Sequence, residues 1–223
     1  MSAAITDAVA GRARIAQRIH GLYAVTPDSA DTSRLVAMVE AAVHGGARVV
    51  QYRNKTADAS QRAEQALALK VALERTQSLF IINDDVELAA QVRAHGVHIG
   101  ENDPDLDDAR QWMGRDAIIG VSCYNDIERA RAAAAAGADY VAFGSFYASG
   151  IKPDARRADI ALLQQGKALG VPVVAIGGIT AQNARALREA GADAVAVISA
   201  VFGSGEPHMI ERAARDIARM FEA

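Results

Sequence analysis

The strongest constraint on the fold of this chain is a regular alternation of short apolar segments with helical segments. Eight apolar segments have the length of one β-strand each, and they lie at residues 21–26, 47–53, 79–84, 96–100, 118–123, 140–144, 173–178 and 194–199. They are continuously apolar, which is typical of parallel strands buried on both faces. Helical patterns follow them at residues 31–44, 57–76, 85–94, 105–113, 125–136, 157–168, 180–190 and 206–222. The order is therefore a strand followed by a helix, eight times.

Several of the helical segments end in a similar turn of small residues that leads into the next strand. The stretches "HGGARVV", "RAHGVHI", "AAGADYVAF" and "EAGADAVAV" place glycine where a left-handed helix cap is expected. Eight such units predict an α/β protein with a closed (β/α)8 TIM barrel. An open doubly wound sheet is the alternative, but "VTPDSA" stands where its G-x-G-x-x-G turn would be.

One barrel accounts for almost the whole chain. The 223 residues, 51% of them hydrophobic, are enough for one sizeable core, and no Pro/Gly/Ser-rich linker divides them. We expect residues 19–223 to form a single barrel domain. Residues 1–18 are expected to form an N-terminal helical extension, because apolar residues recur there at helical spacing.

Charge and cysteine usage narrow the class of partner. The formal net charge is −3, and Lys and Arg are mixed with Asp and Glu, so nucleic acid and membrane surfaces are not expected partners. Small molecules are the expected partners, and a homo-oligomer is possible. The single cysteine, Cys123, suits a reducing compartment, and no apolar leader is evident, so we expect a cytoplasmic protein. Cys123 is expected to be a buried strand-end residue rather than a nucleophile.

Polar side chains stand where the predicted strands end. The stretch "VVQYRNK" begins as a buried strand, and Gln51, Arg53 and Lys55 project from one side of it because side chains alternate along a strand. The carboxyl ends of the strands carry the active site in barrels of this type. We therefore expect the strand-end residues to meet at one rim.

Two aspartates at neighbouring strand ends are candidate ligands for Mg²⁺. Asp84 follows the third strand and Asp103 follows the fourth, and one or two carboxylates are the usual protein share of a Mg²⁺ site. Helix capping is the alternative: Asp84 or Asp85 could cap the helix beginning "VELAA", and Asp103 before Pro104 is also a helix-start signal. Zinc is not expected, because the histidines lack metal-binding spacing and Cys123 has no partner cysteine.

The stretches "AIGGIT" and "VISA" end the seventh and eighth strands and predict a phosphate site. Free backbone N–H groups at these two strand ends bind phosphate in many proteins of this fold, although a tight turn would also require small residues. With Arg53, Lys55 and Lys152 on the same rim, the chain is expected to bind a monophosphate and a diphosphate. No Ser-His-Asp set is evident, so catalysis would be electrostatic.

An ordered set of motifs resembles the thiamine-phosphate synthase family. "QYRNK" is similar to its Q-x-R-x-K signature, and "GVHIGENDPD" matches G-V-H-x-G-x-x-D; "IND", "GVSC", "GADYVAFG", "AIGGI" and "VISA" occur in the expected order. The resemblance covers residues 21–202. It implies a TIM barrel with Mg²⁺ that joins a hydroxymethylpyrimidine diphosphate to a thiazole phosphate, releasing pyrophosphate and leaving thiamine phosphate.

The resemblance also implies a role for individual residues. Asp84 and Asp103 would hold Mg²⁺, and Arg53, Ser122 and Lys152 would be catalytic. The expected substrate-binding residues are Gln51, Tyr52, Arg53, Asn54, Lys55, Asn83, Ser122, Ser149, Gly150, Ile151, Lys152, Gly178, Ile198 and Ser199.

One segment departs from the family pattern. Where the family usually has P-T-x-T-K, this chain has "ASGIK", so both threonine positions differ and somewhat weaker thiazole-phosphate binding is expected. Two other functions stay open. A related barrel tautomerises the thiazole without joining it, but such relatives tend to lose the diphosphate residues. A non-catalytic barrel that binds thiamine phosphate is the other.

Overall fold

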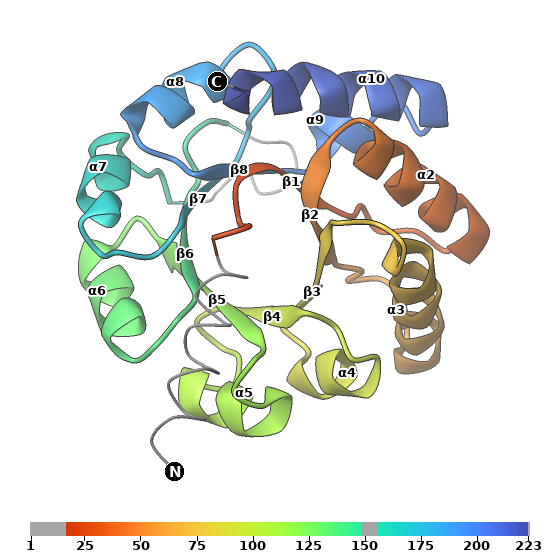
Figure 1. Ribbon diagram of the computed structural model, residues 1–223, viewed down its shortest axis with the longest axis horizontal. Helices are drawn as coiled ribbons and strands as arrows, with labels where there is room; N and C mark the ends of the chain where they lie inside the picture. The colour runs from red at the N-terminus through yellow and green to blue at the C-terminus, as the bar shows by residue number, and fades with distance from the viewer. Residues whose placement is uncertain (1–16, 149–155, 223) are drawn as a thin grey trace.

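Eight parallel strands close into a barrel in the order in which they occur along the chain, as Figure 1 shows. The computed structural model describes residues 17–148 and 156–222. The strands are β1 (Gly21–Val25), β2 (Ala47–Tyr52), β3 (Leu79–Asn83), β4 (Gly96–Ile99), β5 (Ile118–Tyr124), β6 (Tyr140–Gly144), β7 (Val173–Ile176) and β8 (Ala194–Val197). The pairing of β1 with β8 closes the ring. The predicted TIM barrel is confirmed.

Helices surround the barrel (Figure 1). They are α2 (Thr32–His44), α3 (Ala59–Leu73), α4 (Val86–Gln91), α5 (Leu106–Met113), α6 (Ile127–Ala135), α7 (Ala161–Lys167), α8 (Ala184–Ala190), α9 (Ser199–Phe202) and α10 (Pro207–Ala218), followed by the 3₁₀ turn η1 (Arg219–Phe221). Helix α9 was not predicted, because four residues are too few to show helical periodicity. Most of the predicted extension, residues 1–16, lies outside the described residues.

Aspartates begin many of the helices by accepting a hydrogen bond from a backbone N–H in the first turn. The capping residues are Asp31, Asp58, Asp85, Asp105 and Asp126. Such caps satisfy N–H groups that have no partner inside the helix. Asp85 and Asp105 therefore cap α4 and α5, and their neighbours Asp84 and Asp103 are not needed for that purpose.

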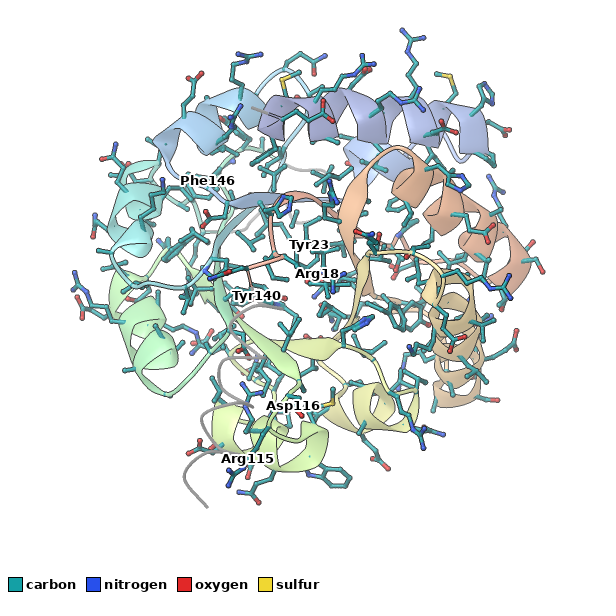
Figure 2. The ribbon with its side chains drawn as sticks, in the orientation of Figure 1. Arg18, Tyr23, Arg115, Asp116, Tyr140 and Phe146 are labelled. Atoms are coloured by element: carbon teal, nitrogen blue, oxygen red, sulfur yellow. The ribbon has the colours of Figure 1, made fainter. Side chains whose placement is uncertain are left out.

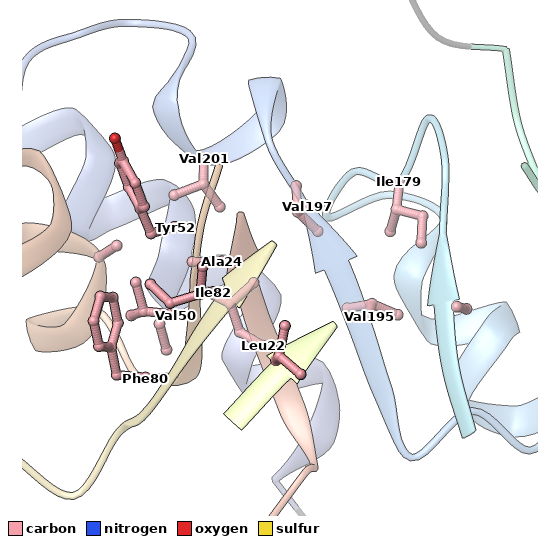
Figure 3. Close-up of a cluster of buried hydrophobic side chains, with 14 of the residues drawn as sticks. Leu22, Ala24, Val50, Tyr52, Phe80, Ile82, Ile179, Val195, Val197 and Val201 are labelled. Carbon is pink, nitrogen blue, oxygen red and sulfur yellow. The ribbon is translucent and has the colours of Figure 1, made fainter. Parts of the chain in front are cut away.

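The core has two layers. Apolar side chains from the outer faces of the strands pack against the helices, and Figure 3 shows part of this layer around Val50, Ile82 and Val195. A smaller cluster fills the barrel interior and includes Ile19, Leu79 and Ile118, which are at most 1% exposed. Among the described residues, the interior is thus filled near the amino ends of the strands, and open space lies toward their carboxyl ends.

Among the described residues, no helix combines the length and the apolar character needed to cross a lipid bilayer.

Candidate active site

A cavity of about 400 Å³ lies at the carboxyl ends of the strands. This size is typical of a site for a small molecule. Its lining includes many of the residues expected from the sequence, which come from β2, β3, β5 and the segments after β7 and β8: Gln51, Arg53, Asn83, Ser122, Gly178, Ile198 and Ser199. The expected convergence at one rim is therefore observed for these residues.

A second hollow of about 250 Å³ continues the site over β2 and β3. Arg53 and Asn83 line both spaces, and Lys55 and Asp84 line this one. The hollow is polar and carries both cations and carboxylates, whereas the large cavity is mostly apolar. One part of the site is thus suited to an anion with a metal, and the other to aromatic rings.

Gln51 places an unused hydrogen-bond donor in the cavity wall. The residue is 4% exposed, and its Nε2 has no hydrogen-bond partner in the described structure. A buried N–H without a partner costs free energy, so buried polar groups are nearly always paired. The orphan donor therefore indicates that a ligand atom completes the pairing.

The exit of β2 is held by two residues that the sequence analysis did not identify. Thr26 Oγ1 donates to the Arg53 carbonyl and accepts from the Arg53 N–H, both at 2.8 Å. Asp28 accepts from the Lys55 N–H at 2.7 Å and pairs with the Arg53 guanidinium at 3.3 Å. These contacts aim Arg53 and Lys55 at the site before any ligand arrives.

Asp84 and Asp103 lie together, as predicted for a metal pair. Asp84 pairs with the Lys55 ammonium at 2.5 Å, and Asp103 accepts from the Gly100 N–H at 2.6 Å. Burial raises the pKa of the Asp103 carboxyl, and the adjacent Asp84 carboxylate adds to the rise. Two carboxylates that repel one another would gain from a shared cation.

The rim around this pair fits Mg²⁺ better than zinc. Among the described residues, no group of three or more His, Cys, Asp and Glu side chains could hold a metal. Zinc sites usually need at least three protein ligands, whereas Mg²⁺ keeps several waters and takes one or two carboxylates together with substrate phosphates. The Asp84 backbone has φ of 63°, a left-handed conformation that aspartate tolerates better than most residues.

Two of the expected binding residues direct their side chains away from the large cavity. Tyr52 points into the outer layer, where its hydroxyl donates to Gln65 Oε1 at 2.9 Å. Asn54 Nδ2 donates to the Ser29 carbonyl, and its Oδ1 accepts from the backbone N–H groups of Thr56 and Ala57. Neither lines the large cavity, but both line the smaller hollow over β2 and β3, together with Arg53 and Lys55. The alternation along the strand that brings Gln51 and Arg53 inward turns these two outward.

The turn after β7 is shaped by two glycines with positive φ. Gly177 has φ of 104° and Gly178 has φ of 63°. A Cβ on Gly178 would lie 2.3 Å from the Ala148 carbonyl oxygen, and a Cβ on Gly177 would lie 2.1 Å from Ser145 Oγ. The tight turn and the expected phosphate site therefore coincide. Thr180 does not cap α8 through its side chain; instead its N–H donates to Asn183 Oδ1.

The cavity also contains polar side chains that the sequence analysis missed. His98, Tyr23 and Tyr140 lie in its wall, linked by hydrogen bonds to one another and to Ser122. The motif "GVHIG" contained the histidine, but the three residues are far apart in the sequence and only the closed barrel joins them. Cys123 is buried, and burial raises its pKa to about 12, so the expectation that it is no nucleophile agrees with its position.

Arg156 is a further cation in the cavity lining that was not predicted. It lies beside the residues of the β6 and β7 ends, on the side of the cavity where the monophosphate was expected. Ser149, Gly150, Ile151 and Lys152 were predicted to contribute to the same region, but they lie outside the described residues.

Comparison with known proteins decides the family. The family model described as "Thiamine monophosphate synthase" matches residues 22–201, which is most of the chain. The chain belongs to the thiamine monophosphate synthase family. This confirms the resemblance inferred from the motifs.

Relatives within the thiamine monophosphate synthase family are similar over nearly their full length. The chain is 53% identical to "Thiamine-phosphate synthase" of Methylobacillus flagellatus, covering 91% of this chain and 96% of the relative. It is 51% identical to the protein of the same name from Thioalkalivibrio sulfidiphilus, covering 92% and 97%. The shared length means that the family's whole barrel is present here.

Solved structures agree with the thiamine monophosphate synthase fold. The chain is similar to "Thiamine phosphate pyrophosphorylase" from Pyrococcus furiosus, with a TM-score of 0.79 and 32% identity, covering 92% of this chain and 96% of that one. A 3-hexulose-6-phosphate synthase has a TM-score of 0.66 at 17% identity, which is a likeness of fold alone.

Proposed function

We propose that this chain is a transferase that joins 4-amino-5-hydroxymethyl-2-methylpyrimidine diphosphate to 4-methyl-5-(2-hydroxyethyl)thiazole phosphate, giving thiamine phosphate and pyrophosphate. Family membership and the full-length relatives named thiamine-phosphate synthase support it. The observation that carries it is the presence of two anion-handling edges around one apolar cavity. Arg53, Lys55 and Asp84, with Asp103 beside Asp84, form one edge, and the glycine turn before α8 with the end of β8 forms the other.

This arrangement separates the joining reaction from thiazole tautomerisation. A tautomerase needs to hold only a thiazole phosphate, so the cationic and carboxylate edge over β2, β3 and β4 would have no ligand. In this chain that edge is built by dedicated contacts, such as those of Thr26 and Asp28 with the β2 exit. A diphosphate and Mg²⁺ are the ligands that its charges match.

In the proposed mechanism, the bond between the pyrimidine methylene carbon and the diphosphate oxygen breaks, and both electrons leave with the diphosphate. The thiazole nitrogen then attacks the resulting pyrimidine cation through its lone pair, forming the new C–N bond. Arg53, Lys55 and, by the family resemblance, Lys152 would offset the charge that grows on the leaving diphosphate. Mg²⁺ held by Asp84 and Asp103 would supply further neutralisation of that charge when bound.

The remaining residues would orient the two substrates. Gln51 Nε2 would donate to an acceptor atom of the pyrimidine, and Asn83 and Ser122 would contact the same substrate. Gly178, Ile198 and Ser199 would hold the thiazole phosphate. The thiazole nitrogen carries no proton to remove, so its attack needs no general base. We place this reaction in the cytoplasm, since the lone Cys123 suits a reducing compartment.

The direct test is to incubate the purified protein with both substrates and Mg²⁺ and to measure thiamine phosphate and pyrophosphate together. We expect the two products to form in equal amounts. Rearrangement of the thiazole without pyrophosphate release would favour the tautomerase instead. Tight binding of thiamine phosphate with no turnover would favour a binding protein, and either result would overturn the proposal.

A further inference from the structure

A continuous array of hydrogen bonds leads from the barrel interior to Ser122 in the cavity wall. The hydroxyl oxygens of Tyr23 and Tyr140 are 2.8 Å apart, and Tyr140 Oη is 3.0 Å from His98 Nδ1. His98 Nε2 is 2.8 Å from Ser122 Oγ. The His98 and Tyr140 rings are stacked, with centroids 5.5 Å apart, and both tyrosines lie near the barrel axis in Figure 2.

The protonation states of the array follow from its surroundings. The two ring nitrogens of His98 face hydroxyl groups, Tyr140 Oη at 3.0 Å and Ser122 Oγ at 2.8 Å, and not carboxylates, which suits a neutral imidazole. Burial raises the pKa values of Tyr23 and Tyr140, so both phenols keep their protons. A neutral imidazole has one N–H donor and one acceptor nitrogen. The imidazole therefore has two arrangements: in the outward direction Nε2–H donates to Ser122 and Nδ1 accepts from Tyr140, and in the inward direction Nδ1–H donates to Tyr140 and Nε2 accepts from Ser122.

The relative strength of the donors and acceptors favours the outward direction. A phenol is a stronger acid, and so a stronger donor, than the hydroxyl of serine, while an imidazole nitrogen is a better acceptor than a phenol oxygen. The best pairing is the Tyr140 hydroxyl donating to His98 Nδ1. The imidazole proton is then on Nε2 and is donated to Ser122 Oγ, and Tyr23 donates to Tyr140.

This direction leaves the proton of the Ser122 hydroxyl free to serve the cavity. In the described structure, Ser122 Oγ has no hydrogen-bond partner other than His98, and Ser122 lines the cavity. With one lone pair taken by the His98 N–H, the hydroxyl can donate to a ligand. In the opposite direction its proton would be given to Nε2, and only its oxygen would face the ligand.

We propose that His98, protonated on Nε2, is a positioning residue that makes the Ser122 hydroxyl a hydrogen-bond donor to the anionic end of the pyrimidine substrate. Tyr140 selects this tautomer by donating to Nδ1. The inference rests on the proposed function, because the diphosphate is the anion that would accept the bond. It adds His98, Tyr140 and Tyr23 to the residues that determine how the substrate is held.

The tautomer is tested without any turnover by ¹⁵N NMR of the full chain with labelled histidines. The His98 signals are identified by their loss in His98→Gln. We expect Nε2 to carry the proton and Nδ1 to behave as a hydrogen-bonded acceptor that becomes less shielded in Tyr140→Phe. A proton on Nδ1 in the wild-type protein would overturn the inference. This result stands even if the protein turns over neither substrate, so failure of the proposed function would be recognised separately.

A double-mutant cycle tests whether the array acts through Ser122. We expect Tyr140→Phe to lower kcat/KM for the pyrimidine diphosphate by about threefold to tenfold, the size of one hydrogen bond, and to have little further effect in a Ser122→Ala background. Effects of the two substitutions that simply multiply would show that Tyr140 has only a structural role and would overturn the inference.

Tyr52→Phe is the matched control, because it also removes one buried phenol hydroxyl, the one bonded to Gln65 in the outer layer. We expect its effect to be independent of Ser122. Rescue provides a second comparison: His98→Gln retains an amide donor and acceptor and should keep more activity than His98→Leu, which has neither. Equal activity of the two variants would count against a hydrogen-bonding role for His98.

Discussion

At the scale of single residues, the rim is organised by charge pairs that a ligand would rearrange. Lys55 pairs with Asp84 at 2.5 Å and Arg53 with Asp28 at 3.3 Å, and the Lys55 side chain is about half exposed. Exposed pairs contribute little to stability, so their value here is to keep the charged groups in place. Asp103 differs from these pairs, because the charged groups near it are the Asp84 carboxylate and the Lys55 ammonium.

The two carboxylates give the first prediction. Asp84→Asn and Asp103→Asn should each raise the Mg²⁺ concentration needed for half-maximal rate by about tenfold or more, because each removes formal charge from a site with few protein ligands. Asparagine also tolerates the left-handed backbone of Asp84. Measuring turnover against Mg²⁺ concentration checks this.

Asp85→Asn is the matched control for both variants. It removes a negative charge from the adjacent position, and asparagine can still cap α4. Its Mg²⁺ dependence should match that of the wild type. If Asp84→Asn and Asp103→Asn also match the wild type, these residues do not hold the metal.

Arg156 gives the second prediction. Arg156 lines the cavity, and its carbonyl accepts from the N–H of Ser145, which lies beside the glycine turn where the thiazole phosphate would bind. Arg156→Gln should weaken thiazole-phosphate binding by roughly tenfold, the low end for loss of a hydrogen bond to a charged group, because the side chain is exposed. The affinity for pyrimidine diphosphate should change much less.

Arg157→Gln removes the same charge one residue along the chain, and Arg157 does not line the cavity. Titration of each substrate against both variants separates a local contact from a general effect of charge. Equal weakening in the two variants would rule out a specific role for Arg156.

Sequence reasoning found the site residues that follow strand alternation and missed those that depend on tertiary contacts. Gln51 at the end of β2 and Arg53 just after it line the large cavity, and Arg53 and Lys55 line the adjoining hollow; their place at the rim could be predicted from their spacing. Tyr23 and Tyr140 are 117 positions apart, and only closure of the barrel brings their hydroxyls together. Binding by Asn54 was predicted from its place in a motif; its side chain hydrogen-bonds the local backbone, and the residue lines the smaller hollow.

At the scale of elements, the turn between β7 and α8 is the part most sensitive to side-chain volume. Its glycines face the backbone of the segment after β6, and Tyr147 donates its N–H to the Gly177 carbonyl at 3.0 Å. The two segments are therefore fitted to one another. Any displacement of the glycine turn would also move the segment after β6.

The third prediction uses this fit. Gly178→Ala should lower both the free energy of unfolding and the affinity for thiazole phosphate, because its Cβ would lie 2.3 Å from the Ala148 carbonyl oxygen. Gly170→Ala is the control: Gly170 also has a left-handed φ, of 73°, but nothing lies within 4 Å of its Cβ position. Both variants incur the left-handed penalty of about 1–2 kcal/mol.

The clash should cost Gly178→Ala about 1–3 kcal/mol more than the control, as overpacking does elsewhere. Urea denaturation and substrate titration of the two variants provide the measurement. Equal stability and equal affinity would mean that the turn adjusts freely and that its glycines serve only the backbone conformation.

The elements themselves were largely predictable, because eight buried strands leave a clear apolar signal. Their boundaries were less so. The predicted eighth strand reached residue 199, but β8 ends at Val197 and Ser199 begins α9. The apolar letters of "VISAVF" are compatible with either state. Helix α7 was expected from residue 157 and begins at Ala161, because the segment before it hydrogen-bonds the end of β6: Ser145 donates to the Arg156 carbonyl and accepts from the Ala158 N–H.

At the scale of the whole molecule, Cys123 reports on the integrity of the barrel. Its side chain is 0% exposed, and burial raises the pKa of the thiol from 9.0 to about 12. The folded chain therefore holds the proton at a pH where the unfolded chain loses it. The stability linked to this group is full below pH 9 and falls as the pH rises toward 12.

The fourth prediction follows from this burial. An alkylating reagent at pH 8 should leave Cys123 unmodified in the folded protein and should modify it as urea unfolds the barrel, because the thiolate is the reactive form. Labelling followed by mass spectrometry, compared with the unfolding curve from circular dichroism, checks the correspondence. Rapid modification without urea would show local opening near the end of β5.

The filled barrel interior at the amino ends of the strands affects how substrates and products reach and leave the cavity. In the part of the chain that the structure describes, Ile19, Leu79 and Ile118 close the interior at the amino ends of the strands, and the cavity opens at their carboxyl ends. Both substrates would enter, and both products would leave, through the opening at the carboxyl ends of the strands. Pyrophosphate formed over β2 and β3 would occupy the binding site of the next pyrimidine diphosphate. Pyrophosphate should therefore be a competitive inhibitor with respect to that substrate. Release of pyrophosphate would then have to precede binding of the next pyrimidine diphosphate in each catalytic cycle.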